Sequence, residues 1–391
     1  MGSRRQLAAT ELRIPERVSR EQGCLHRDRL VCTSRVPADS ALARGSTHGR
    51  ARNGGRRPAT LQRHARLVEQ RVQPPAAAVR AQRGRFGFRQ RVVFPLHPQH
   101  RSSWRAHAGA ELRIFACEPE WAALAEELGG DLVESYSATT ALQDPHYIQA
   151  RPSLIAQVRR ADLVICSGAQ LEIGWLPALL QKANNREVMP GSDGYFEASS
   201  YVVRLDATAD VDRAKGDIHP QGNPHIQTDP RNILAVAAAL SNRLKKIDSD
   251  NSVTYEEKFK QFSTSWREAI GRWEARAQPL GGTRVITHHK SWVYLEKWLG
   301  LVEVANLEAI PGLPPTATHL SRLTGQFGEG GADVIIRSPY QDDKSSHWLS
   351  ERIDVPAIVL PLTVGGTEQA TDLYALFDDI ITRLLEATGN G

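Results

Sequence analysis

The sequence predicts an α/β protein in which two parallel-sheet lobes are joined by one long backbone helix. From residue 111 onward, short apolar runs alternate with segments of helical periodicity, as in parallel strands with helical crossovers. The alternation occurs in two regions, and a largely polar helical stretch separates them. We therefore expect an N-terminal extension at residues 1–110, an α/β lobe at 111–249, a linking helix at 250–280 and a second α/β lobe at 281–391.

In the first lobe, strands are expected at residues 112–117, 131–137 and 162–166. Between the first two, apolar residues recur at helical spacing until Gly129 and Gly130 end the helix. Ser153 is expected to cap a short helix that precedes the third strand.

Two helices are expected next, at residues 233–247 and 255–277, with a break at 248–250. The second would span about 33 Å at 1.5 Å per residue, which is roughly the width of a domain. Its few large apolar residues and many charges suit a rod between two lobes.

In the second lobe, strands are expected at residues 284–287, 302–305, 332–336 and 357–360. Helices are expected at 292–299, 316–326, 346–352 and 372–387. The last helix has a clean apolar stripe and therefore should pack against the core.

Residues 1–110 differ from the rest of the chain in charge. They hold 23 of the 49 Lys and Arg residues, all of them Arg, but only 6 of the 44 Asp and Glu residues. Such a composition buries too little apolar surface to fold, so we interpret the stretch as disordered or as translated from a start placed too far upstream. A nucleic-acid-binding arm is the alternative, but few aromatic residues accompany the arginines, and no nucleic-acid partner is expected.

The sequence gives indirect signs of export. It contains no run of 18 apolar residues, so no transmembrane helix is expected. A signal peptide is not legible, because the N-terminus lacks an apolar stretch of about 7–15 residues. Small residues alternate at 106–110, as at a cleavage site. We expect a periplasmic protein whose true start has been altered and whose mature form begins near residues 109–111.

Cys117 and Cys166 end two of the expected strands. If these strands are neighbours in a parallel sheet, the two sulfurs come within bridging distance. An exported protein would permit a disulfide, and two buried free thiols are the alternative.

Four residues with metal-ligating side chains lie far apart in the sequence, each at the boundary of an expected element. They are His146, His225, His289 and Asp372. Three imidazoles and one carboxylate would complete a tetrahedral zinc shell, and the proline before His146 and before His225 restricts each loop. Two ligands from each lobe would place the metal in the cleft between the lobes.

These segments resemble the solute-binding proteins of ABC importers for zinc and manganese, the cluster A-I family with a helical backbone. The resemblance rests on Asp-Pro-His at 144–146, Asn-Pro-His at 223–225, His289 before Trp292 and Tyr294, and Asp372 before Tyr374. His288 leaves the register ambiguous, and alignment to Tyr294 favours His289. In place of the His-rich loop of many zinc members stands segment 206–219, where His219 is a candidate auxiliary ligand and an ordinary loop residue is the alternative.

The resemblance implies a monomeric, non-enzymatic protein that captures Zn²⁺ as its transported ligand and delivers it to the membrane permease of an ABC importer. Imidazole ligands favour zinc, while manganese or another divalent metal is the alternative, as is an adhesin-like surface protein on the same scaffold. A zinc hydrolase is a remote alternative, because four protein ligands leave no open position for water and no His-Glu-x-x-His or Gly-x-Ser-x-Gly motif occurs.

Overall fold

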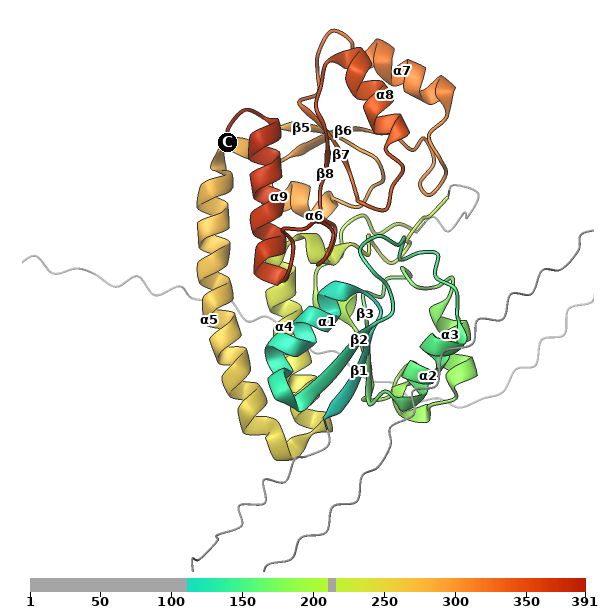
Figure 1. The fold of residues 1–391 in the computed structure, drawn as a ribbon, viewed down its shortest axis with the longest axis vertical. Coiled ribbons are helices and arrows are strands. Elements are labelled where there is room, and N and C mark those ends of the chain that lie inside the picture. The colour runs from blue at the N-terminus through green and yellow to red at the C-terminus, as the bar shows by residue number, and fades with distance from the viewer. Residues whose placement is uncertain (1–110, 210–215) are drawn as a thin grey trace, which may run out of the picture. The chain divides into compact units, whose positions relative to one another are not determined.

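The computed structural model describes residues 111–209 and 216–391, which build two parallel β-sheets flanked by helices (Figure 1). The first sheet contains β1 (Leu112–Ala116), β2 (Val133–Ser137), β3 (Leu163–Cys166) and β4 (Tyr195–Glu197), in the order β2-β1-β3-β4. The second contains β5 (Arg284–Thr287), β6 (Val302–Asn306), β7 (Val334–Arg337) and β8 (Ala357–Val359), in the order β6-β5-β7-β8. The predicted α/β class with two parallel sheets is confirmed.

The two sheets share more than their strand order. Arg113, in β1, forms an ion pair with Asp162 before β3, and Arg284, in β5, forms one with Asp333 before β7. In each pair the same carboxylate also accepts the backbone N–H of its arginine, at 2.9 Å and 2.7 Å. The lobes therefore repeat one topology, although no internal repeat is visible in the sequence.

The helices of the first lobe are α1 (Pro119–Gly129), α2 (Pro152–Arg160) and α3 (Leu176–Ala183). The expectation that Ser153 caps α2 is wrong, because the helix already begins at Pro152 and Arg151 holds the capping position. Proline suits the first helical position, where no N–H partner is available anyway. Helix α3 and strand β4 were not predicted, and β4 has only three residues.

Two helices form the backbone of the fold, α4 (Pro230–Ile247) and α5 (Ser252–Ala277). Helix α5 packs against α4 and α1 on the side of the first lobe, and against α9 (Leu373–Ala387) on the side of the second (Figure 1). The predicted long helix is confirmed. Because the described residues cluster as one compact unit, the division into lobes at residues 249 and 281 stays our proposal.

The second lobe also contains α6 (Val293–Leu299), α7 (Ala317–Phe327) and α8 (Lys344–Ile353). No helix in the described part of the chain is long and apolar enough to cross a membrane. The predictions for residues 1–110 fall outside the described residues.

Trp266 lies at the centre of the packing between the backbone helices. Its side chain is fully buried, and its ring lies 4.8 Å from the ring of Tyr374 and 5.7 Å from that of Phe377, both in α9. Its indole N–H donates to the carbonyl of Pro230, the first residue of α4, at 2.8 Å. One side chain thus joins α4, α5 and α9.

We predict that Trp266→Ala lowers the free energy of unfolding by about 3–5 kcal/mol, because a large buried ring is replaced by a cavity. Urea unfolding at constant m-value measures the change. Val253→Ala, at an exposed position of the same helix, is the control and should change the free energy by less than about 0.5 kcal/mol. Equal losses in both variants would contradict the central role of Trp266.

Candidate metal site

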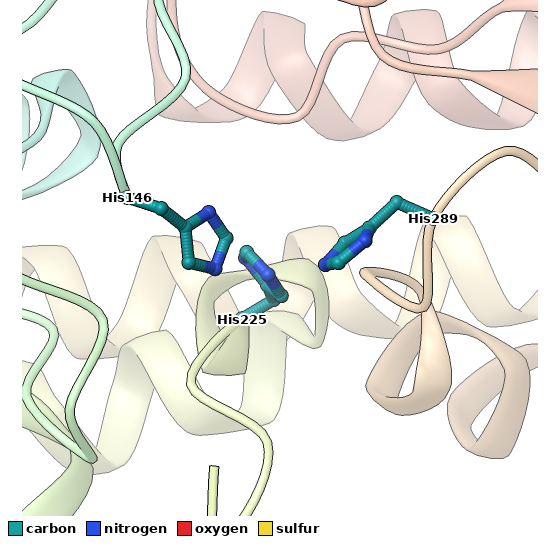
Figure 2. Close-up of side chains that lie close together, drawn as sticks. All are labelled: His146, His225 and His289. Atoms are coloured by element: carbon teal, nitrogen blue, oxygen red, sulfur yellow. The ribbon is translucent and has the colours of Figure 1, made fainter. Parts of the chain in front are cut away.

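Three histidines from different parts of the chain converge on one point. His146 lies in the loop after β2, His225 precedes α4, and His289 follows β5. One ring nitrogen from each lies within 4.8 Å of the others, and all three side chains are buried. Figure 2 shows the rings pointing toward one another from three separate segments. The structure thus brings together three of the four predicted ligands.

Two carboxylates orient the outer rings. Nδ1 of His146 lies 2.7 Å from Oδ1 of Asp144, and Nδ1 of His289 lies 2.7 Å from Oε2 of Glu308. A carboxylate at these distances accepts, so Nδ1 carries the proton and the lone pair is on Nε2. A metal ligand whose second nitrogen donates to a carboxylate is a frequent arrangement in zinc sites.

His225 is held by its backbone. The N–H of His225 donates to the side chain of Asn223 at 3.0 Å, and the side chain of Asn223 donates to the carbonyl of Lys290 at 2.7 Å. Tyr294 donates to the carbonyl of Asn223 at 2.7 Å. These bonds tie the His225 loop to the segment after His289. His225 is only 1% exposed, and neither of its ring nitrogens has a hydrogen-bond partner in the protein.

His219 lies beside one of the three rings, in the segment after the undescribed residues 210–215. Its Nε2 lies 3.2 Å from Nε2 of His146, and the ring centroids are 5.3 Å apart. Two neutral imidazoles can share at most one proton at this contact, so at least one of the two Nε2 atoms has a lone pair. The residue considered as a possible auxiliary ligand therefore lies beside His146, next to the three clustered rings.

The environment keeps these rings neutral. Burial, together with the neighbouring His146 and His289, lowers the pKa of His219 to about 3. Burial and the other histidines also hold the pKa of His225 well below its usual value. A neutral imidazole is the form that binds a metal.

The structure corrects the prediction for Asp372. This exposed residue is the N-cap of α9, and its Oδ1 accepts the N–H of Ala375 at 2.8 Å. It borders a separate hollow with Pro119 and Lys258, apart from the histidines. The physical reason is local, because an Asp before a helix satisfies a backbone N–H that has no partner within the helix. An acidic residue at that position carried no information about the metal.

His288 is buried but stands aside from the cluster. Its Nε2 lies 3.8 Å from Oε1 of Glu308, and burial lowers its pKa. The register that places His289 rather than His288 at the site agrees with the geometry.

A cavity of about 430 Å³ opens onto the site. Its wall includes His146 and His289 and four acidic side chains, those of Asp144, Asp217, Glu308 and Asp342. Acidic walls raise the local concentration of cations.

Asp217 connects the two sides of this opening. Its carboxylate accepts from the hydroxyl of Tyr147 at 2.9 Å, and its N–H donates to the carbonyl of Pro311 at 2.9 Å. Gly312 donates in turn to the same oxygen of Glu308 that holds His289. A side chain at Gly312 would collide with Asp217, and its φ of +78° also favours glycine. These hydrogen bonds therefore connect Tyr147, the neighbour of His146, with Glu308, the carboxylate that accepts from His289.

The roles of Asp144 and Glu308 were not predicted from the sequence. A signal existed for Asp144, because an Asp two residues before a His can bind both its backbone and its ring, as it does here. No such signal existed for Glu308, which follows β6. It reaches His289 because β5 and β6 are neighbours in the sheet.

The sequence profile described as "ZnuA: Zinc-uptake complex component A periplasmic" matches residues 114–387. The chain belongs to the ZnuA family. The match covers both lobes, and the resemblance found in the sequence is thereby confirmed.

Several relatives of this ZnuA-family chain bear metal-transport names. The manganese ABC transporter substrate-binding lipoprotein PsaA of Streptococcus pneumoniae serotype 4 is 24% identical over 270 residues, which cover 68% of this chain and 84% of that protein. The metal ABC transporter substrate-binding lipoprotein SloC of Streptococcus mutans serotype c is 20% identical over 274 residues, which cover 68% and 86%.

Solved structures show the same fold. The crystal structure of ZnuA has a TM-score of 0.60 at 22% identity and covers 71% of this chain and 99% of its own. An Mn-bound periplasmic metal binding protein from Candidatus Liberibacter asiaticus has a TM-score of 0.58 at 16% identity and covers 71% and 100%. The ZnuA-family chain is a metal-binding substrate-binding protein of an ABC importer.

We predict that Asp144→Asn and Glu308→Gln each weaken metal binding by about 10–100-fold, because each removes the acceptor that fixes a ring tautomer. Competition with a chromophoric chelator measures the affinity. Asp342 lines the same cavity but accepts from the backbone N–H of Lys344. Asp342→Asn is therefore the matched control, and it should change the metal affinity only through the loss of one negative charge. Equal losses in all three variants would mean that charge alone matters.

We also predict that the metal-free ZnuA-family protein loses stability as pH falls below about 6.5, the ordinary pKa of histidine. His219 and His225 stay neutral in the folded state, while in the unfolded chain they take up protons. Their contribution is fully present above about pH 6.5 and declines toward the folded pKa of His219 of about 3.

Urea unfolding of metal-free protein at about pH 7.5 and about pH 5.5 measures this change, since the two conditions bracket the ordinary histidine pKa. His219→Gln should reduce the difference between them, whereas His347→Gln, at an exposed position of α8, should leave it unchanged. A difference that His219→Gln does not alter would show that this ring titrates normally.

Proposed function

We propose that this chain captures Zn²⁺ outside the cytoplasm, in a periplasm, and delivers it to the membrane permease of an ABC importer. We further propose that His146, His219, His225 and His289 bind the ion and that the chain acts as a monomer. The ion is the transported cargo, so no catalytic step is involved.

The observation that carries this proposal is the distance of 3.2 Å between Nε2 of His146 and Nε2 of His219. Zinc–nitrogen bonds of about 2.0–2.1 Å at a tetrahedral angle place two ligand nitrogens about 3.3–3.4 Å apart. Without a cation, two buried rings at this distance have only one weak shared hydrogen bond. With Zn²⁺ between them, both lone pairs are satisfied.

The donor set favours zinc over manganese. Four imidazoles are nitrogen donors, which suit Zn²⁺, whereas Mn²⁺ prefers carboxylates and water. The two carboxylates nearest the cluster, Asp144 and Glu308, each accept from a ring nitrogen. Manganese is the second candidate, because relatives such as PsaA are named for it.

The rim of the site supports delivery to a partner. Tyr147, Ile173 and Leu313 line a second cavity, beside His146 and His219, and each side chain is more than half exposed. They come from the segments that follow β2, β3 and β6. We propose that this rim meets the permease, so that the bound ion faces its entrance.

The test is metal content and competitive titration of the full chain with Zn²⁺ and Mn²⁺. The wild type should hold one zinc per chain and prefer zinc to manganese. His225→Ala and His219→Ala should each weaken zinc binding by more than about 100-fold, beyond the effect of losing an outer hydrogen-bond partner. His288→Ala is the control, because this ring is buried beside the site but faces Glu308 at 3.8 Å.

A preference for Mn²⁺ would overturn the cargo assignment. An affinity that His219→Ala leaves unchanged would remove His219 from the shell and leave a three-histidine site with one open position.

A further inference from the structure

A second group of metal-ligating side chains lies in the first lobe, at the carboxyl ends of β1 and β3. Cys117 and Cys166 form a disulfide there, and neither is exposed. The two sulfur atoms and one carboxylate oxygen of Glu172 lie within 4.8 Å of one another. The bridge that the sequence left open is therefore formed, and an acid stands directly beside it.

The carboxyl groups of Glu172 and Glu118, on this side of the first lobe, are both deeply buried. Glu172 and Glu118 are each only 3% exposed, and no Lys, Arg or His among residues 111–209 and 216–391 forms a salt bridge with either. Glu172 accepts the N–H of Gly168, and Oε2 of Glu118 accepts the N–H and hydroxyl of Ser167. Oε1 of Glu118 is buried without a protein partner.

The two acids also interact with each other. Burial raises the pKa of Glu118 well above its usual value, and the nearby Glu172 raises it further. Burial likewise raises the pKa of Glu172 to about 7. Buried carboxyls of this kind require a proton or a cation to be stable.

We propose that Cys117, Cys166 and Glu172 form a second binding site for a soft divalent cation such as Zn²⁺ or Cd²⁺, which the disulfide closes and reduction opens. A dithiol reductant supplies two electrons and two protons, becomes a disulfide itself and leaves two thiols on the chain. Binding of the cation then releases both thiol protons and yields two thiolate–metal bonds.

The geometry fits such a site. The Cα atoms of the cysteines are 4.8 Å apart, and the neighbouring strands β1 and β3 hold them at the carboxyl end of the sheet. Two thiolates and one carboxylate are a ligand set that zinc accepts, and soft sulfur favours Zn²⁺ and Cd²⁺ over Mn²⁺. The disulfide would thus direct zinc to the imidazole cluster by removing a competing thiolate site.

The test compares oxidised and reduced forms of the full chain in a Cys24→Ser, Cys32→Ser background, which removes the other two cysteines of the sequence. Because both sulfurs are buried, the disulfide is reduced with a trialkylphosphine in mild denaturant. Water supplies the oxygen of the phosphine oxide that forms. The denaturant is removed before titration with Cd²⁺ alone, and near-ultraviolet circular dichroism checks the fold.

The reduced protein should bind one more Cd²⁺ than the oxidised protein and show an ultraviolet thiolate-to-cadmium charge-transfer band, which imidazole ligands do not produce. Glu172→Gln should weaken this second site at least tenfold while the histidine site keeps its affinity. Cys117→Ser should abolish the band.

A folded, reduced protein with two free thiols but no band would overturn the proposal, as would a second site that Glu172→Gln leaves unchanged. If Cys117→Ser does not fold, the comparison of redox states and Glu172→Gln still decide. The result is independent of the imidazole site, because only sulfur ligands give the band.

Discussion

The site depends on one physical constraint: several imidazoles must be buried together and kept neutral, with their lone pairs aimed at a common point. Hydrogen bonds from His146 to Asp144 and from His289 to Glu308 meet the directional part of this requirement. Burial meets the other part, because it disfavours the protonated ring at His219 and His225. The same burial leaves nitrogen atoms without protein partners, and such atoms have a high affinity for a cation.

The scaffold explains why this arrangement persists. His146 and His289 follow strands of different sheets, and both loops lie at the carboxyl ends of parallel strands, where ligands usually bind in α/β folds. His225 belongs to neither sheet. It precedes α4, whose first residue, Pro230, accepts the indole N–H of Trp266. Packing of α5 against both lobes therefore sets the position of the central ring, and stability and metal geometry depend on the same helices.

The disulfide and the metal cluster occupy comparable places in the first lobe, since Cys117, Cys166 and His146 all lie at or beyond the carboxyl ends of β1, β3 and β2. The carboxyl end of the first sheet thus presents both sulfur and nitrogen donors. Oxidation removes the sulfur donors from competition and leaves a uniform set of imidazoles. Under this proposal, the redox state of Cys117 and Cys166 affects which site of the protein binds the metal.

The sequence by itself determined the α/β class, all strands but β4, the long helix and three of the histidines. Local signals carry these features, namely apolar periodicity, prolines before His146 and His225, and short motifs around each ring. Only the tertiary structure decided which other side chains lie against the three rings. Glu308 reaches His289 through the pairing of β5 with β6, and His219 reaches His146 from a segment with no periodic pattern. Asp372 has a side chain that can bind a metal and matches the family motif, yet its carboxylate accepts the backbone N–H of Ala375 instead. Contacts between segments far apart in the sequence leave no local periodicity, so they become visible only once the chain has folded.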